Sequence, residues 1–458
     1  MDRILGVVAV LGVAVLAYLY GFASDRYDLF PSKFVADGIV ATKAFTELWA
    51  EDDMPPGFLK LEPASTPRGV EATQNQAAQA DGLILVAGGP YRLMDKCPEL
   101  GCLAWLMNRS GEVVYAWPVR ENQPWAKFEH MQGQPRPDRI YPVGVHAFDN
   151  GDLAVSFQSK GTFPFGVGIA KVDKDGNTIW KHENFAHHWF DVGDDGRIYT
   201  PTQKLIPNPH KLGDTPISLN CESRMIYDDH VTIIAPDGTI ETEFSVLDAM
   251  VDSGYVGLIE RTRSQCDPLH LNDVRILKAA DAAEYPTLQA GDLLVSMNTI
   301  NTAAVLDGTT HKVKWITSGH TVGQHNPRYG GNNKILLLDN RGGSAAGGGT
   351  RIVAVDVATD SIETIFPGPS TPKGLNYHTE VGGHFDLDAD RKAALFSIGA
   401  AGSIVEIEFG SGNVLWKYNN VFDMEPFMRA KGTKLDPTFA RFAVSSSYHT
   451  GDLPFLQK

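Results

Sequence analysis

Five histidines of the chain each stand at the head of a similar segment, in which a turn and an apolar strand follow the histidine. They are His146, His188, His270, His325 and His384. In the clearest copy, residues 319–341, His325 precedes a Gly/Asn turn and an apolar strand, and the segment ends at Arg341. The chain has only 14 histidines, so composition alone does not explain five copies. A structural repeat therefore places one histidine after another at equivalent positions.

Several imidazoles beside an arginine are compatible with three kinds of site. A metal site needs about three ligands roughly 2 Å from one ion, which strands across a channel rarely supply, so we expect no metal. Protonated histidines and Arg341 could instead bind an oxyanion and stabilise developing negative charge. A neutral imidazole could also be the nucleophile of a group transfer. The remaining alternative is that some of the five histidines only hydrogen-bond neighbouring strands.

The elements that position these histidines are strands. From residue 80 onward, short segments rich in β-branched and aromatic residues alternate with Asp-Gly and Asn-Gly turns, which is typical of all-β proteins. A second motif, a turn followed by an outer strand, occurs at 107–117, 172–182, 234–244, 306–316, 355–366 and 407–418. One blade for each copy predicts a six-bladed β-propeller over residues 80–420. We expect residues 421–458 to close the ring or to pack beneath it.

The geometry of a propeller makes the histidines converge. The innermost strand of each blade lines the central channel, and the loops that enter these strands open on one face. We therefore expect the five histidines to surround the channel mouth. The first blade, with a strand at 83–89, has no histidine there. The long insertions at 201–230 and 245–269 are expected to be loops on one face.

The N-terminal segment differs from the rest of the chain. Residues 4–22 are a continuous apolar run, long enough to predict a transmembrane signal anchor within residues 1–24. The alternative is a cleaved signal peptide, and in either case the rest of the chain is exported. Residues 25–79 are expected to form an amphipathic helix at about 32–50 and a linker. That helix either packs on the propeller or docks on a membrane partner.

The cysteines and the net charge restrict the environment and the partners. Four cysteines favour two structural disulfides, Cys97–Cys102 and Cys221–Cys266, as one of three possible pairings. A metal site would need thiols more closely grouped with histidines. The formal charge of −15 argues against nucleic acid as a partner. An anionic ligand would need a locally basic pocket.

Three motifs carry a resemblance to a known family. The segments DPLHLNDV (267–274), QHNPRY (324–329) followed by LLLDNR (336–341), and HHWFDVGDDGRIY (187–199) resemble those of the arylsulfotransferases. These are bacterial, exported, six-bladed propellers that use no nucleotide sulfate donor. The resemblance extends over residues 80–420 and implies a ping-pong reaction. An aryl sulfate would give its sulfuryl group to a channel histidine, and a phenol would then accept it.

The resemblance also implies roles for individual residues. His270 and His325 match the sulfate-binding and acid–base histidines, and Arg341 matches the sulfate-clamping arginine. Val405 stands where the family has its nucleophilic histidine. Either His384 or His378 has taken that role, or the protein keeps the fold and the anion pocket without the transfer chemistry. Further candidates for ligand binding are His146, His188, Asn272 and Arg328.

Taken together, the sequence predicts an arylsulfotransferase-like protein anchored in the inner membrane by residues 4–22, with its propeller in the periplasm. Its expected partners are an aryl sulfate, a phenolic acceptor, the lipid bilayer and a membrane protein, and no cofactor is expected. The alternative is a non-catalytic propeller subunit of a membrane complex that lacks the nucleophile. Some blades also resemble quinoprotein-type propellers, but those normally have eight blades and no histidine at each inner strand.

Overall fold

The computed structural model describes residues 2–26, 62–63, 69–71, 82–88, 102–120, 124–125, 130–131, 140–159, 165–222, 225–423, 425, 439–451 and 453–457. The chain divides into two units, Met1–Pro55 and Pro56–Lys458. The first unit contains helix α1 (Asp2–Arg26), whose apolar side chains from Leu11 to Phe22 are exposed. Within the described residues, no helix combines the length and the apolar character needed to cross a membrane. The expected amphipathic helix at 32–50 lies outside the described residues.

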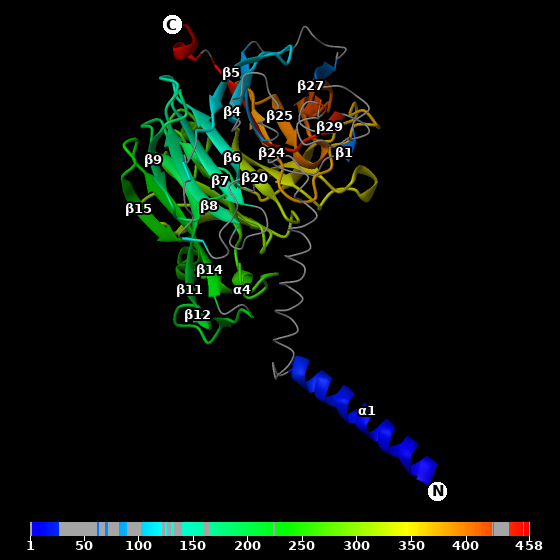
Figure 1. Ribbon diagram of the computed structural model, residues 1–458. Helices are drawn as coiled ribbons and strands as arrows, with labels where there is room; N and C mark the ends of the chain where they lie inside the picture. The colour runs from blue at the N-terminus through cyan, green and yellow to red at the C-terminus, as the bar shows by residue number, and fades with distance from the viewer. Residues whose placement is uncertain are drawn as a thin grey trace. The chain divides into compact units, whose positions relative to one another are not determined.

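The second unit is a six-bladed β-propeller, as the sequence predicted (Figure 1). Each blade is an antiparallel sheet of four strands, and one blade carries a fifth strand at its outer edge. The strands of the first three blades are β3 (Leu83–Gly88), β4 (Cys102–Met107), β5 (Val113–Pro118) and β30 (Val444–Thr450); β6 (Ile140–Ala147), β7 (Leu153–Ser159), β8 (Gly166–Val172) and β9 (Thr178–His182); and β10 (Asp191–Val192), β11 (Ile198–Pro207), β14 (Met225–Ile234) and β15 (Ile240–Ser245).

The fourth, fifth and sixth blades follow in chain order. Their strands are β16 (Leu271–Ile276), β17 (Leu293–Met297), β18 (Thr302–Leu306) and β19 (Val313–Ser318); β20 (His325–Gly331), β21 (Lys334–Asp339), β22 (Arg351–Asp356) and β23 (Ile362–Phe366); and β24 (His384–Leu387), β25 (Ala393–Ile398), β26 (Ser403–Glu408) and β27 (Val414–Asn419) with β2 (Gly69–Glu71) at the edge. The innermost strands are β30, β6, β10, β16, β20 and β24.

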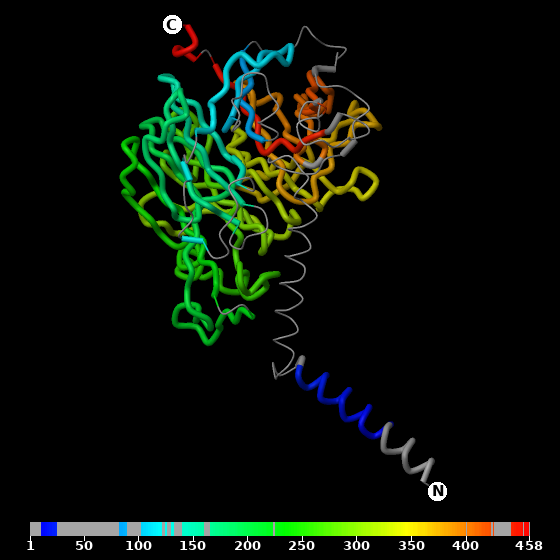
Figure 2. Tube along the Cα trace, viewed as in Figure 1, coloured from blue at the N-terminus to red at the C-terminus, as the bar shows by residue number. Residues whose placement is uncertain are grey.

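The ring is closed by strands from both ends of the propeller. β30, near the C-terminus, pairs with β3 from Leu83↔Thr450 to Gly88↔Val444 and becomes the innermost strand of the first blade. Figure 2 shows the tube returning to the first blade in this way. The C-terminal segment therefore closes the ring, the first of the two alternatives left by the sequence. A small sheet of β1 (Glu62–Pro63), β29 (Phe439–Arg441) and β28 (Val421–Asp423) accompanies it.

The strands are held together by apolar side chains between neighbouring blades. Between the fifth and sixth blades, Leu338, Ile352, Phe396 and Val405 are buried in one cluster. Burial of such side chains stabilises the sheets by roughly 25 cal/mol per Å² of apolar surface. Asp-Gly turns connect the strands of several hairpins. Glycine suits these turns because it adopts a left-handed φ, +84° at Gly176, without strain.

The two insertions extend the third and fourth blades. The hairpin β11–β14 continues beyond the sheet and carries β12 (His210–Lys211) and β13 (Ser218–Leu219). After β15, the chain forms α3 (Val246–Asp252) and α4 (Val256–Ile259) before it reaches β16. Short 3₁₀ helices η4 (Ala282–Glu284), η5 (Ala345–Gly347), η6 (Gly399–Ala401) and η7 (Pro454–Gln457) lie in other connections.

Candidate active site at one mouth of the channel

A cavity of about 760 Å³ lies where several innermost strands begin, and three of the five histidines line it. The ring centroid of His188 is 5.2 Å from that of His270 and 6.2 Å from that of His325. Other lining residues are Tyr141, Val143, Gln158, Phe165, Trp189, Asn298, Val381, Gly382, Gly383, Gly399, Ala443, Val444 and Ser445. The volume suits a small organic ligand.

Two of the three histidines have an unusual backbone conformation. The φ angles of His188 and His270 are +52° and +50°, a left-handed region that bulky residues seldom adopt. The carbonyl of His188 accepts a hydrogen bond of 2.6 Å from Ser156, and the carbonyl of His270 accepts one of 3.2 Å from the Asn298 N–H. Such conformations persist when the surroundings fix them and are concentrated at functional sites.

His270 is stabilised in its charged form by a carboxylate, that of Asp267. Its Nδ1 lies 2.5 Å from Oδ2 of Asp267. Burial would lower the pKa of His270, but the charge and hydrogen bond of Asp267 outweigh burial and raise that pKa above its ordinary value. The Nε2–H has no hydrogen-bond partner among the described residues. His270 can therefore donate this proton to a ligand in the cavity.

His325 is neutral, and its tautomer is fixed by Asn340. The Nδ2 of Asn340 donates to the carbonyls of Thr379 and Gly382 at 2.8 and 2.7 Å, so its Oδ1 must face His325. Nδ1 of His325 donates to this Oδ1 at 2.8 Å and to the Gly323 carbonyl at 2.9 Å. Burial lowers the pKa of His325 to about 4. Its Nε2 therefore has a free lone pair on the ring edge opposite Asn340.

His188 is a second neutral imidazole of the cavity. Burial, followed by the nearby His187, His270 and His325, holds its pKa well below the ordinary value. The ring of Phe165 packs 5.6 Å from His188 and 5.3 Å from His270, centroid to centroid. Together with Trp189, it gives the cavity an aromatic wall.

Two arginines lie beside this cavity, and the sequence indicated only one of them. Arg341 is exposed, and its side chain has no hydrogen bond with a described residue. Its Nε would be 3.5 Å from a Cβ added at Gly323, so it lies next to the segment that leads to His325. Arg263 donates to Oδ1 and to the carbonyl of Asn298 at 2.8 and 2.7 Å.

Electrostatic interactions also connect Arg263 with Arg341 and with two histidines of the cavity. Burial and the neighbouring Arg341 lower the pKa of Arg263, and its charge acts on both His270 and His325. Sequence reasoning missed Arg263 because it lies in an insertion outside the repeats. Its position seven residues before His270, beside Cys266, was the signal that could have identified it.

Asn272 supports the backbone of the site and does not face a ligand. It is fully buried, and its Nδ2 donates to the carbonyl of Gln324 at 2.8 Å. The side chain of Gln324 in turn donates to the carbonyls of Met297 and Thr302, both at 3.0 Å. These contacts fix the backbone immediately before His325.

Arg328 and His384 lie deeper, in the interior of the channel. Arg328 donates to Oδ2 of Asp273 at 3.2 Å and to Nε2 of His384 at 2.9 Å. Asp273 is also paired with Arg275 at 2.8 Å. The ring of His384 is fully buried, and Arg328 already uses its Nε2 lone pair. His384 therefore has its Nε2 lone pair occupied, and it does not line the histidine cavity.

The other candidate nucleophile, His378, the family's nucleophile position, Val405, and the ligand-binding candidate His146 do not line this cavity either. Nδ1 of His378 lies 3.2 Å from the hydroxyl of Thr350, and His378 does not line the cavity. Val405 is fully buried on β26, where it packs in the core. His146 lies at the end of β6 and lines a different cavity.

The depth of each histidine in the channel follows from the number of residues between it and the next turn. His146 lies two residues before Phe148, the first residue of its turn, and His384 lies four before Asp388. His188 is five residues before Gly193, whereas His270 and His325 are each seven before Leu277 and Asn332. A strand advances about 3.3 Å per residue, so these histidines lie at different levels of the channel.

One predicted disulfide is present next to the site. Cys221 and Cys266 are joined and connect the β11–β14 extension to the segment that carries Arg263 and Asp267. The other predicted pair includes Cys97, which lies outside the described residues. Within the described part of the chain, no group of three His, Cys, Asp or Glu side chains could hold a metal ion.

The fold and the site define a β-propeller with a histidine-lined cavity at one channel mouth and two arginines beside it. The family model of the arylsulfotransferases (ASST) matches residues 144–420, which is more than half of the chain. The chain belongs to the arylsulfotransferase family. No curated protein matches it.

Solved structures show only distant similarity. A protein of unknown function from Bacteroides caccae has a TM-score of 0.46 and 10% identity, covering 81% of this chain and 100% of its own. A streptogramin B lyase has a TM-score of 0.38 and 12% identity over 79% and 98% of the two chains. The virginiamycin B lyase from Staphylococcus aureus has a TM-score of 0.32 and 14% identity over 60% and 69%.

Proposed function

We propose that this protein transfers the sulfuryl group of an aryl sulfate to a phenol, with His325 as the histidine that carries it. One observation supports this most directly: a tautomer-fixed His325, whose pKa burial lowers, and a His270 whose pKa Asp267 raises line the same cavity. Arg263 and Arg341 supply positive charge for the sulfate oxygens. The proposal assigns the nucleophile to a residue other than Val405, His378 or His384.

In the first half-reaction, Nε2 of His325 attacks the sulfur atom and the bond from sulfur to the aryl oxygen breaks. The imidazolium of His270 gives its Nε2 proton to the leaving phenolate, which departs as a phenol. The products are an N-sulfo-imidazolium at His325, the phenol and a neutral His270. The proton on Nδ1 of His325 remains shared with Asn340 and Gly323.

The second half-reaction reverses these steps with another phenol. Neutral His270 takes the hydroxyl proton while the phenol oxygen attacks sulfur, and the bond from sulfur to His325 breaks. The new aryl sulfate leaves, and both histidines return to their starting protonation states. Because Asp267 stabilises the charged form of His270, it supports both the acid and the base step.

The walls of the cavity favour an aromatic substrate. Phe165, Trp189 and Tyr141 provide aromatic surface beside the histidines, and Val143, Val381 and Val444 add apolar contacts. A planar aryl ring packs well against such side chains. The proposed substrate class is therefore an aryl sulfate donor with a phenolic acceptor.

A transfer assay tests the role of His325. Purified protein is incubated with 4-nitrophenyl sulfate and a phenol, and the quenched enzyme is digested for mass analysis. We expect turnover and a sulfated peptide containing His325, both abolished in His325→Gln. The matched control His378→Gln should retain activity, since His378 does not line the cavity.

Two outcomes would contradict this assignment. A sulfated peptide containing His378 or His384 would move the nucleophile elsewhere. No turnover and no adduct with several donors would instead support the non-catalytic alternative, a propeller subunit of a membrane complex. Affinity capture with the intact N-terminal segment would then identify that partner.

We further propose that the propeller is exported to the periplasm and retained at the inner membrane through residues 4–22. The exposed apolar side chains of α1 support retention, and the Cys221–Cys266 disulfide is compatible with an oxidising compartment. Fractionation of cells with alkaline extraction of the membranes tests this. Recovery of the protein in the cytoplasmic fraction would contradict it.

A further inference from the structure

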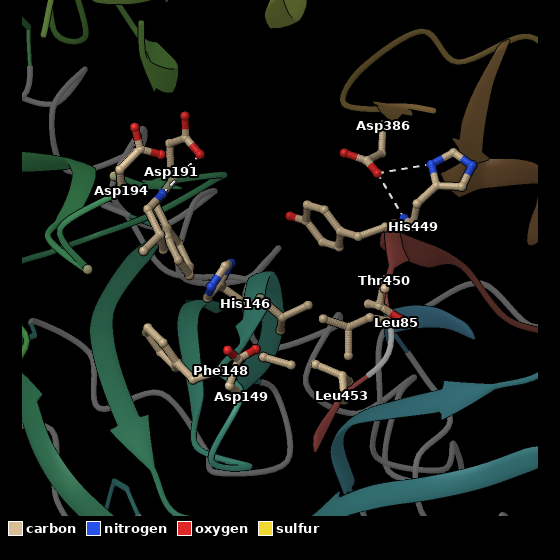
Figure 3. A pocket seen from close by; sticks show the side chains of 18 of the residues that line it. Leu85, His146, Phe148, Asp149, Asp191, Asp194, Asp386, His449, Thr450 and Leu453 are labelled. Carbon is tan, nitrogen blue, oxygen red and sulfur yellow. Dashed lines mark hydrogen bonds and ion pairs between the residues drawn. The ribbon is translucent and has the colours of Figure 1, made fainter. Parts of the chain in front are cut away.

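A second cavity, of about 790 Å³, lies at the opposite ends of the innermost strands (Figure 3). His270, which lines the first cavity, immediately precedes β16, whereas Arg275, near the other end of β16, lines the second cavity. Along the closing strand β30, Ser445 lines the first cavity and Tyr448 the second. The buried Asp273–Arg328–His384 contacts occupy the level between them. The second cavity is therefore separate from the proposed sulfuryl-transfer site.

His146 projects into this second cavity from the end of β6 (Figure 3). Its imidazole is half-buried and packs edge-on against Phe148, with the ring centroids 4.8 Å apart. It has no hydrogen bond with any described residue, and burial lowers its pKa to about 4. A half-buried imidazole without a protein partner leaves both nitrogens available to water or a ligand. It offers one acceptor and one donor.

The wall opposite His146 presents a fixed carboxylate. Oδ2 of Asp386 accepts hydrogen bonds from the backbone N–H and Nδ1 of His449 at 2.8 and 3.2 Å. The other ring nitrogen of His449, Nε2, lies 3.2 Å from Oε1 of Glu406. The second oxygen of Asp386, Oδ1, has no partner among the described residues. This oxygen is available to a ligand.

The free charges around the cavity are mainly negative. Asp149 and Asp194 are exposed at its rim, and neither carboxylate has a hydrogen bond or ion pair with a described residue. Three of the lining cations are already paired: Lys171 with Asp152 at 3.0 Å, Arg275 with Asp273 at 2.8 Å, and His449 with Asp386 and Glu406, both at 3.2 Å. Lys278 is the lining cation that lacks such a pair within the described part of the chain.

Aromatic surface accompanies these carboxylates. Phe148 and Phe190 line the same cavity, and the ammonium of Lys171 already lies 4.4 Å from the ring centroid of Phe148. An ammonium group is attracted both to carboxylate oxygens and to aromatic faces. The formal charge of −15 on the whole chain attracts cations to the molecule as well.

We propose that this second cavity binds an organic ammonium ion that carries an apolar body. The ammonium group is recognised by the free carboxylate oxygens of Asp386, Asp149 and Asp194, and the apolar body packs against Phe148 and Phe190. His146 supplies a neutral hydrogen-bonding group between these two regions. The site goes beyond sulfuryl transfer and does not depend on it.

Calorimetric titration of the full chain with benzylammonium tests the proposal, with benzyl alcohol as the uncharged comparison. We expect benzylammonium to bind and benzyl alcohol to bind at least tenfold more weakly. The double variant Asp149→Asn/Asp194→Asn should weaken benzylammonium binding several-fold, and Lys278→Met should strengthen it. His146→Trp, which places a larger ring in the cavity, should weaken benzylammonium binding further. Asp237→Asn, on an exposed turn away from the cavity, should change nothing.

Three results would overturn the proposal. The first is the absence of binding at millimolar benzylammonium, and the second is equal affinity for benzyl alcohol. The third is unchanged benzylammonium binding in both His146→Trp and the Asp149/Asp194 double variant. Circular dichroism of every variant checks that it is folded, so that a loss of binding is not caused by unfolding. Activity toward 4-nitrophenyl sulfate is assayed separately, so failure of sulfuryl transfer does not bear on this site.

Discussion

The two central histidines of the proposed active site differ in the group that faces Nδ1. A carboxylate, Asp267, faces His270 and stabilises its cation, whereas an amide oxygen, from Asn340, faces His325 and leaves it neutral. Burial acts against the charge in both rings. The partner atom therefore decides which histidine is an acid and which has a free lone pair.

Replacing Asp267 by Asn tests this division at the residue scale. The carboxylate raises the pKa of His270, so His270 stays protonated up to a higher pH than an unpaired buried histidine. Without it, the alkaline limb of the rate profile should move to lower pH. At neutral pH, turnover of phenyl sulfate should fall by about 10²-fold, the lower range for general acid catalysis.

The choice of donor supplies the control for that variant. 4-Nitrophenolate leaves more readily than phenolate and needs less protonation, so Asp267→Asn should slow 4-nitrophenyl sulfate less than phenyl sulfate. Steady-state rates for both donors across the pH range give this comparison. An unshifted alkaline limb, or equal losses for the two donors, would show that His270 is not the general acid.

The sequence predicted part of this arrangement and missed the rest for physical reasons. His270, His325 and Arg341 stand in motifs that could be recognised, and the structure places them in or beside one cavity. The tautomer of His325 could not be predicted, because Asn340 is oriented by carbonyls in the connection leading to the next blade. Arg263 lay in an insertion with no repeat to mark it.

At the scale of elements, the insertions of the third and fourth blades hold part of the site. The loop before β16 carries Arg263 and Asp267, and the Cys221–Cys266 disulfide ties it to the β11–β14 extension. The backbone N–H of Tyr227 also donates to the Cys266 carbonyl at 2.8 Å. The disulfide therefore limits the movement of the acid–base pair.

Removing this disulfide should affect both stability and catalysis. The variant Cys221→Ser/Cys266→Ser frees a closed loop with a sequence separation of 45 residues, and we expect a loss of about 2–4 kcal/mol in unfolding free energy. Because Asp267 directly follows Cys266, kcat should fall as well. Denaturant unfolding and steady-state assays measure these effects. Unchanged kcat in a destabilised variant would show that the disulfide does not position the site.

The positions of the histidines along the strands could have been predicted more closely. The common motif of histidine, turn and strand suggested one level, but the spacing from histidine to turn varies from two residues at His146 to seven at His325. Since each strand residue advances about 3.3 Å, this variation distributes the histidines along the channel. His146 consequently faces the opposite mouth.

At the scale of the whole molecule, six repeated outer strands predicted six blades correctly, whereas closure of the first blade by the C-terminal segment was one of two alternatives that the sequence left open. The innermost strand there, β30, comes from the C-terminal segment and belongs to no repeat. A group of charged residues joins it to the sixth blade. Arg109 pairs with Glu406 at 2.8 Å, and His449 lies 3.2 Å from both Glu406 and Asp386.

The protonation of His449 should make ring closure depend on pH. Burial opposes its charge, but Asp386 and Glu406 raise the pKa of His449 to about 9, above the value of 6.5 expected when unfolded. The resulting stabilisation is fully present below pH 6.5 and is lost as the pH rises through about 9. A difference of this size corresponds to about 3 kcal/mol.

Unfolding experiments on the wild type and His449→Gln between pH 6 and 10 test this dependence. The wild type should lose about 3 kcal/mol more than the variant over this interval, because the variant has no imidazolium to deprotonate. The variant should also be less stable than the wild type at pH 6, where the wild-type ring is charged. Parallel stability curves for the two proteins would mean that His449 does not fasten β30 to the sixth blade. The ring would then be closed by the β3–β30 pairing and its apolar packing alone.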